Sequence, residues 1–140
     1  MKIIDKLFLK KEIKSKEGIL HFKRWQLLKT PWFSIYIHGI YKSDEDKHLH
    51  DHPWDYISFS FYGRFIEKNK GTYKCKYLYV PTFKIIKRKA EHLHSIHKLL
   101  TKSVYTFFIA FKRRREWGYV VNGKWIDNKT YRKLKNLNKL

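Results

Sequence analysis

The stretch His48-Leu49-His50-Asp51-His52-Pro53-Trp54-Asp55 decides how this chain folds and what it can bind. Alternate residues of a β-strand point to the same face, so His50 and His52 project together while Asp51 lies on the other side. A second cluster, His92-Leu93-His94, follows later in the chain. Neutral imidazole binds Fe, Ni, Cu and Zn, and three protein ligands leave positions open for water or substrate. Two imidazoles from the first cluster and one from the second would form such a set.

The sequence on both sides of this stretch predicts short β-strands. Apolar residues alternate with other residues over 33–38 and 56–62, and Gly63 ends the second run. Further strands are expected at 73–80, 104–111, 117–121 and 124–126, and Asn122-Gly123 between the last two is a strong hairpin signal. An amphipathic helix is expected over residues 3–14, and residues 130–140 form a basic terminal helix or a frayed end. Eight or nine short strands indicate a sandwich or barrel.

Composition limits the class of protein. A chain of 140 residues has the length of one domain, 1–140, and 43% hydrophobic residues can build a core. Cys75 is the only cysteine, which excludes an internal disulfide and a thiolate zinc cluster. The first residues carry too many charges for a secretory signal, and no stretch is long enough to span a bilayer. We therefore expect a cytoplasmic protein that does not bind membranes.

The net charge of +20 is unevenly distributed. Residues 1–55 carry a net +3, and residues 56–140 carry a net +17. The densest basic run, Lys112-Arg113-Arg114-Arg115, follows an apolar strand, so we expect it on a loop at the rim of the barrel, outside the histidine motifs. Such a loop is solvated or clamps an anion or a phosphate backbone. Weak, sequence-independent binding to nucleic acid is therefore expected, because charge alone is a non-specific signal.

The spacing after His50 resembles the first motif of the cupin superfamily, whose members are small double-sheet jelly-roll barrels. That motif reads His-x-His, three or four residues, Glu, six residues, Gly. Here His50 and His52 are followed by Tyr56 in the glutamate position, with Asp55 as the neighbouring carboxylate, and by Gly63 in the glycine position. The second cupin motif is matched by Phe83 in place of a turn glycine, the pair Ile85-Ile86, the small residue Ala90 and the ligand His94.

The resemblance covers residues 33–111 and implies an all-β double-stranded β-helix in which His50, His52 and His94 bind a metal. The chain is also similar to a family of small cupin proteins of phages and bacteria, which implies a metal barrel and little about its substrate. The strings that carry this similarity are Arg24-Trp25, Tyr36-Ile37-His38, Asp44-x-Asp46, His50-Asp51-His52-Pro53-Trp54-Asp55, Arg113-Arg114-Arg115-x-Trp117-Gly118 and Trp125.

A rival frame uses His48 and His50 as the ligand pair, with Asp55 in the glutamate position. Periodicity does not separate the two frames, because His48, His50 and His52 share one face. The frame through Tyr56 also places the glycine correctly, and we favour it. Its lack of a carboxylate ligand has a precedent, since thiol dioxygenases of the cupin class bind iron through three histidines.

Several other residues are candidates for the site. Tyr56 and Asp55 are the catalytic candidates, and Asp55 could orient a ligating imidazole. Arg24 and Arg64 could bind a substrate carboxylate or phosphate through a bidentate guanidinium, and His38 could line the same pocket. Each of these three also has a plain reading as a solvated or packed side chain.

The leading hypothesis is a metal-dependent cupin enzyme, an Fe(II) oxygenase or a related enzyme, acting on a small and in some cases anionic molecule. Zn, Ni or Mn could replace Fe(II), because imidazole accepts several first-row ions. The alternative is a basic module that binds nucleic acid or an acidic partner, with a structural metal or none. A metal-free, epimerase-like barrel using His and Tyr is a third class. The sequence does not fix the oligomeric state, and a homodimer is compatible with it.

Overall fold

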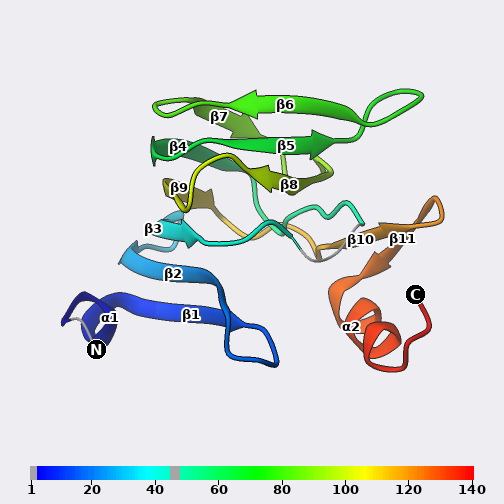
Figure 1. The fold of residues 1–140 in the computed structure, drawn as a ribbon, viewed down its shortest axis with the longest axis horizontal. Helices are drawn as coiled ribbons and strands as arrows, with labels where there is room; N and C mark the ends of the chain where they lie inside the picture. Colours follow the sequence, from blue (N-terminus) through cyan, green and yellow to red (C-terminus); the bar gives the residue numbers. More distant parts are fainter. Residues whose placement is uncertain (1–2, 45–47) are drawn as a thin grey trace.

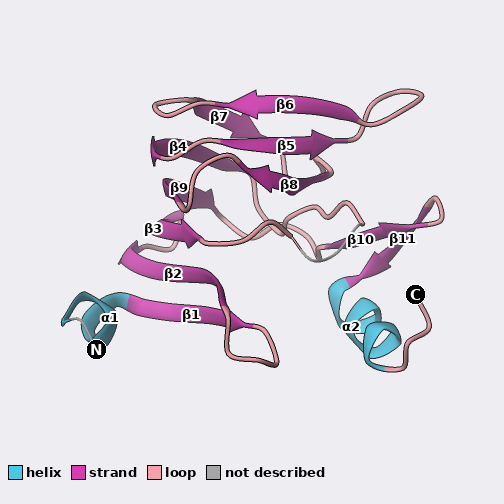
Figure 2. Ribbon diagram, in the orientation of Figure 1, coloured by secondary structure: helices cyan, strands magenta, loops and turns pink. Residues whose placement is uncertain are grey.

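The computed structural model describes residues 3–44 and 48–140 and is built almost entirely from antiparallel strands (Figures 1 and 2). Asp46, part of one string quoted above, lies outside the described residues. The elements are α1 (Ile3–Phe8), β1 (Leu9–Lys14), β2 (Leu20–Lys29), β3 (Phe33–Ile40), β4 (Tyr56–Tyr62), β5 (Phe65–Asn69), β6 (Lys76–Val80), β7 (Ile85–Arg88), β8 (His94–Leu99), β9 (Val104–Phe111), β10 (Gly118–Val121), β11 (Lys124–Asp127) and α2 (Asn128–Asn136).

Two sheets form the jelly-roll barrel. One has the strand order β1-β2-β3-β9-β4-β7 and the other the order β6-β5-β8, while β10 and β11 form a separate hairpin. Figure 1 shows the three-stranded sheet facing the larger one, with α1 and α2 at opposite ends of the long axis. This is the all-β fold with short terminal helices that the sequence predicts.

The predicted helix over residues 3–14 is wrong in its second half. Only Ile3–Phe8 is helical, and Leu9–Lys14 forms β1, which pairs with β2. The apolar residues Leu9 and Ile13 share one strand face, and the other face carries only the charged residues Lys10, Glu12 and Lys14. The segment therefore also has the period of a strand, and pairing with β2 satisfies its backbone groups.

Turn positions have the backbone geometry that their residues suggested. Asn122 and Gly123 have φ values of 50° and 77°, as a two-residue hairpin between β10 and β11 requires. Phe83, which stands where the second cupin motif has a glycine, also has a positive φ of 69°. At Gly63 a Cβ would lie 2.2 Å from the carbonyl oxygen of Ser103, so only glycine fits there.

The apolar core lies between the sheets at one end of the barrel. Its buried members are Ile40, Phe65, Val80, Ile86 and Val104. A smaller cluster of Tyr56, Phe108 and Ala110 packs with Tyr36 and Trp54. These clusters border a cavity of about 430 Å³, lined on the larger sheet by residues of β1, β2, β3, β9, β4 and β7.

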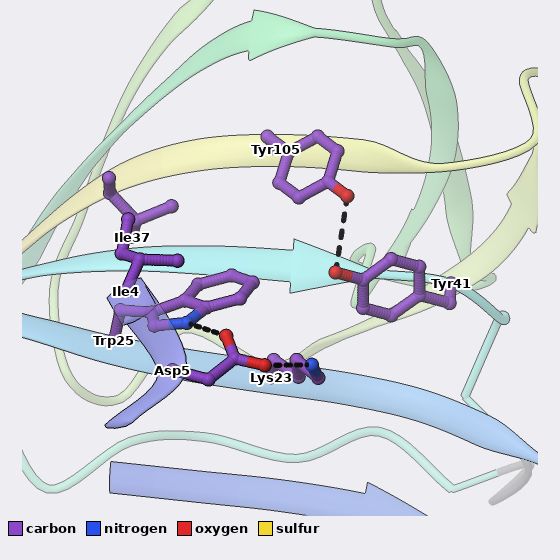
Figure 3. A pocket seen from close by; sticks show the side chains of 7 residues that line it. All are labelled: Ile4, Asp5, Lys23, Trp25, Ile37, Tyr41 and Tyr105. Carbon is purple, nitrogen blue, oxygen red and sulfur yellow. Dashed lines mark hydrogen bonds and ion pairs between the residues drawn. The ribbon is translucent and has the colours of Figure 1, made fainter. Parts of the chain in front are cut away.

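A second hollow, of about 480 Å³, lies where α1 crosses the larger sheet (Figure 3). The Asp5 carboxylate accepts hydrogen bonds from Trp25 Nε1 and Lys23 Nζ, both at 2.8 Å, which fixes α1 on β2. Tyr105 donates to Tyr41 across the same hollow at 3.1 Å. None of the residues that line it is a histidine.

Of the helices in the described ranges 3–44 and 48–140, none is long and apolar enough to cross a membrane.

Candidate metal centre

Three histidines from two distant parts of the chain converge in the barrel cavity. One ring nitrogen each of His50, His52 and His94 lies within 4.8 Å of the other two, and all three side chains are half-buried. The Nε2 atoms of His52 and His94 are 2.8 Å apart. Two ligands about 2.1 Å from one ion at right angles lie about 3.0 Å apart, so this spacing is close to what a shared ion requires.

Backbone pairing places the ligand segment. His50 exchanges both backbone hydrogen bonds with His94, at 2.9 and 3.0 Å, which brings the first cluster against β8. The His52 amide donates to the Ala90 carbonyl at 3.0 Å. His48, the ligand of the rival frame, is instead 3.0 Å from the Tyr131 hydroxyl through its Nδ1 and lies outside the cluster. The structure therefore brings together the three histidines of the first frame.

His52 and His94, whose Nε2 atoms face each other, have surroundings that suit metal ligands. Burial, followed by the neighbouring imidazoles His94 and His50, lowers the pKa of His52 well below its ordinary value. His94 contacts the Glu67 carboxylate through Nδ1, and its Nε2 faces His52. A carboxylate on Nδ1 fixes the tautomer that leaves the Nε2 lone pair for a metal.

Glu67 contacts the histidine cluster and is not among the site residues predicted from the sequence. It lies on β5, is 3% exposed and is also 3.2 Å from Arg88 Nη2. The sequence signal for Glu67 was its place in Phe65–Asn69, a candidate strand that follows Gly63. The inward-facing residues Glu67 and Asn69 are polar, so a search for apolar alternation passes over this strand.

Tyr56 is the predicted catalytic residue that reaches the cluster. It is 3% exposed, stacks on Phe108 with ring centroids 4.6 Å apart, and places its hydroxyl 3.4 Å from His94 Nε2. Burial, then the negative charge of Glu67, raises the pKa of Tyr56, so its phenol is neutral and can donate a hydrogen bond.

Asp55 faces away from the imidazoles. Its Oδ1 accepts from the Ala90 amide at 2.8 Å and from Arg114 Nη2 at 2.6 Å. The Arg114 hydrogen bond is the main reason that the pKa of Asp55 is lowered. Ala90 also accepts from the His52 amide, so Asp55 contacts the ligand segment only through the backbone.

Two of the three predicted substrate-binding residues line the cavity. Arg24 and His38 do so from β2 and β3, and Arg24 Nε donates to His38 Nε2 at 3.0 Å. Arg64 is not among the cavity-lining residues. It is exposed in the turn after β4, and its backbone amide binds Thr101.

The arginine run lies on a loop after β9, as expected, but each guanidinium has an acidic partner. Arg113 is 2.9 Å from Glu116, and Arg114 binds both Asp55 and Glu91. The expectation that the cluster stands outside the histidine motifs is wrong for Arg115, which is 2.6 Å from Asp51.

Asp51, between His50 and His52, is 2% exposed. Besides Arg115 it accepts hydrogen bonds from the Gly118 amide at 2.7 Å and from Trp125 Nε1 at 2.9 Å. It therefore attaches the ligand segment to the β10–β11 hairpin.

No family model matches this chain, and no curated protein matches it. Among solved structures, FeII HppE in complex with its substrate aligns at a TM-score of 0.60 and 14% identity, over 79% of this chain and 59% of that chain. Hydroxypropylphosphonic acid epoxidase from S. wedmorenis aligns at 0.58 and 14%, over 79% and 58%. A protein from Ralstonia eutropha provisionally described as a mannose-6-phosphate isomerase aligns at 0.56 and 11%, over 65% and 84%.

Identities this low establish the fold alone, and this chain spans less than two thirds of the epoxidase chains. The fold is that of a cupin-like barrel, and its cavity contains a three-histidine cluster that suits a divalent metal.

Proposed function

We propose that this protein is a metal-dependent cupin enzyme that acts on a small molecule, with His50, His52 and His94 as ligands of one divalent transition ion. The observation that carries the proposal is the convergence of three imidazoles on the wall of a cavity of about 430 Å³. A facial set of neutral nitrogen ligands suits Fe(II), with Zn, Ni or Mn as alternatives. The likeness to HppE, a protein described with Fe(II) and substrate bound, supports iron as the first ion to test.

The residues present fit such an ion. His94 has its Nδ1 occupied by Glu67, and burial keeps His52 neutral, so lone pairs face the point between the rings. A bound ion would supply Lewis acidity and coordination positions open to a small molecule. The chain itself supplies orientation and shielding, because Phe108 and Trp54 close the cavity wall beside the cluster.

In this proposal Tyr56 is the catalytic residue. Its neutral hydroxyl beside His94 Nε2 can donate a hydrogen bond to an oxygen of the bound substrate or deliver a proton there. Asp55 acts as a positioning residue, because it holds the Ala90 amide while the Ala90 carbonyl receives the His52 amide.

The test is metal analysis of untagged protein purified without chelators and reloaded anaerobically with Fe(II). We expect about one ion per chain in the wild type. We expect almost none in His94→Ala, with an unchanged far-ultraviolet circular dichroism spectrum. His97→Ala is the matched control, because His97 lies on the same strand but is exposed and packs on Tyr77. Full metal content in His94→Ala would show that the ligand assignment is wrong.

A second variant tests the supporting carboxylate. Glu67→Gln keeps the size of the side chain but removes its charge, and we expect metal affinity to fall about 10- to 100-fold. Oxygen uptake by the iron-loaded protein with pools of small molecules then tests the enzyme assignment. Oxygen uptake that requires a component of the pool and is lost in Tyr56→Phe supports a catalytic role for Tyr56. Unchanged oxygen uptake in Tyr56→Phe would show that Tyr56 is not catalytic.

A further inference from the structure

A row of polar side chains crosses the inner face of the larger sheet at one level. Strand register places Lys11 of β1 opposite Arg24 of β2, Arg24 opposite His38 of β3, and His38 opposite Thr106 of β9. All four line the cavity that contains the three histidines. Like charges directly opposite each other on neighbouring strands destabilise a sheet, so the Lys11–Arg24 pair costs folding free energy.

Lys23, the neighbour of Arg24 on β2, is a cation of this sheet that has acidic partners. Lys23 points to the other face and forms ion pairs with Asp5 at 2.8 Å and Glu12 at 3.7 Å. For Arg24, by contrast, no carboxylate of residues 3–44 and 48–140 lies within ion-pair distance.

Arg24 is nevertheless held in one orientation. Its Nε donates to His38, whose pKa burial lowers well below the ordinary value, so the imidazole is a neutral acceptor. The guanidinium carbon lies 5.0 Å from the ring centroid of Tyr36 and 5.9 Å from that of Trp54. Its terminal Nη groups have no hydrogen-bond partner in the part of the chain that the structure describes. The four N–H donors of the two Nη groups are therefore left for a ligand, and two of them are parallel.

The surrounding charges are also mostly positive. Burial, then the positive charges of Arg24 and Arg132, lowers the pKa of Lys11. Within residues 3–44 and 48–140, the acidic residues that line the cavity are engaged elsewhere: Asp44 accepts from the Ile96 amide, and Glu67 contacts Arg88 and His94.

We propose that Arg24 and Lys11 bind an oxyanion, the carboxylate, phosphate or phosphonate group of a small molecule that extends from them toward the histidine cluster. Arginine binds such groups bidentately, and the aromatic rings around the Arg24 guanidinium hold it in its orientation. A bound anion would relieve the repulsion between Lys11 and Arg24. The folding free energy that this repulsion costs would then contribute to the affinity for the anion. That this anion belongs to the substrate rests on the function proposed above.

The test uses acetate, inorganic phosphate and neutral acetamide as probes, with thermal unfolding and tryptophan fluorescence as readouts. It is performed on chelator-treated and on Zn-loaded protein. We expect acetate or phosphate, but not acetamide, to raise the melting temperature in both forms.

In Arg24→Met and Lys11→Met we expect anion affinity to fall about tenfold or more. Without anion, Arg24→Met should be at least as stable as the wild type, because the like-charge pair is gone. Arg64→Met is the matched control, since Arg64 does not line the cavity.

The anion site would be overturned by no response to either anion, by an equal loss in Arg64→Met, or by destabilisation of Arg24→Met with an unchanged anion response. An Arg24-dependent response to a single-stranded oligonucleotide alone would also overturn it, in favour of a nucleic-acid phosphate. If the protein binds the anions but no metal, only the proposed enzyme function is wrong. If it binds metal but does not respond to either anion, only the proposed anion site is wrong.

Discussion

The inner and outer faces of the six-stranded sheet differ in polarity. On β3, β4 and β9 the outward side chains are apolar or aromatic, among them Ile37, Phe59 and Phe107. The inward ones include His38, Ser58 and Thr106 beside the apolar residues of the core. A small barrel normally fills its interior with apolar side chains. Here part of the interior is polar, and that part coincides with the cavity and the three histidines.

The same contrast holds for charge on β2. Lys23 on the outer face has two acidic partners, and Arg24 on the inner face stands opposite another cation. Lys23 is therefore paired within the chain, while Arg24 in the cavity has no carboxylate partner among residues 3–44 and 48–140. The contrast can be tested by matched changes on the two faces.

The largest effect is expected for Phe108→Ala on the inner face. Phe108 is 7% exposed and packs on Tyr56 and His38, with ring centroids 4.6 and 4.5 Å apart. Removing a buried phenyl group lowers the free energy of unfolding by about 3–5 kcal/mol. Urea unfolding measures this, and metal content should fall as Tyr56 and His52 lose their support. A loss below about 1 kcal/mol would mean that the inner aromatic cluster does not support the barrel.

Asp51→Ala should cost almost as much. The change leaves Arg115 and Trp125 Nε1 without their carboxylate and frees the segment that carries His50 and His52. Breaking a buried ion pair by removing one partner costs about 3 kcal/mol or more. We expect metal content to fall with stability, which can be followed by metal analysis beside urea unfolding. An Asp51→Ala protein with full stability would show that the hairpin does not hold this segment.

Phe107→Ala on the outer face is the matched change to Phe108→Ala. Phe107 is the next residue on β9, is 39% exposed and packs on Phe61 with ring centroids 4.7 Å apart. Because its ring is only partly removed from water, we expect a loss of about 1 kcal/mol in urea unfolding. Metal content and the anion response should be unchanged. A metal or anion defect in this variant would break the separation between the two faces.

Features coded by neighbouring residues could be predicted from the sequence. These are the shared face of His50 and His52 and the Asn122-Gly123 hairpin. For the tail, the sequence left a helix and a frayed end open, and the structure has the helix Asn128–Asn136 after an Asp127 cap. Each depends on local φ/ψ preferences or on the strand period. The resemblance to a cupin motif added His94, and the structure places that residue in the same cluster.

What could not be predicted depends on contacts between distant strands. Glu67 reaches His94 because β5 pairs with β8, and Arg115 reaches Asp51 across a long loop. The segment Leu9–Lys14 has both helical and strand periods, and only pairing with β2 decides between them. The role of Arg24 depends on Lys11 being opposite to it, which requires the register of β1.

The smallest effect is expected at the rim that joins the two faces, where Arg114 holds two carboxylates. The Arg114 hydrogen bonds lower the pKa of Glu91 to about 2 and also lower the pKa of Asp55. A carboxylate whose pKa is depressed in the folded state stabilises the fold above its unfolded pKa of about 4.5. That contribution is lost as the pH falls from there toward about 2, because the unfolded chain takes up protons first.

Stability of the wild type should therefore decline through this acid range, and Arg114→Met should make the decline shallower. The difference should be small, because Arg114 and Glu91 are exposed and solvent screens their attraction. Urea midpoints at pH 7, 4 and 3 measure it, with Arg113→Met as the control, because Arg113 pairs with Glu116 and not with these carboxylates. An equally steep decline in Arg114→Met would assign the acid sensitivity to the interior instead, where Glu67 contacts Arg88 and His94.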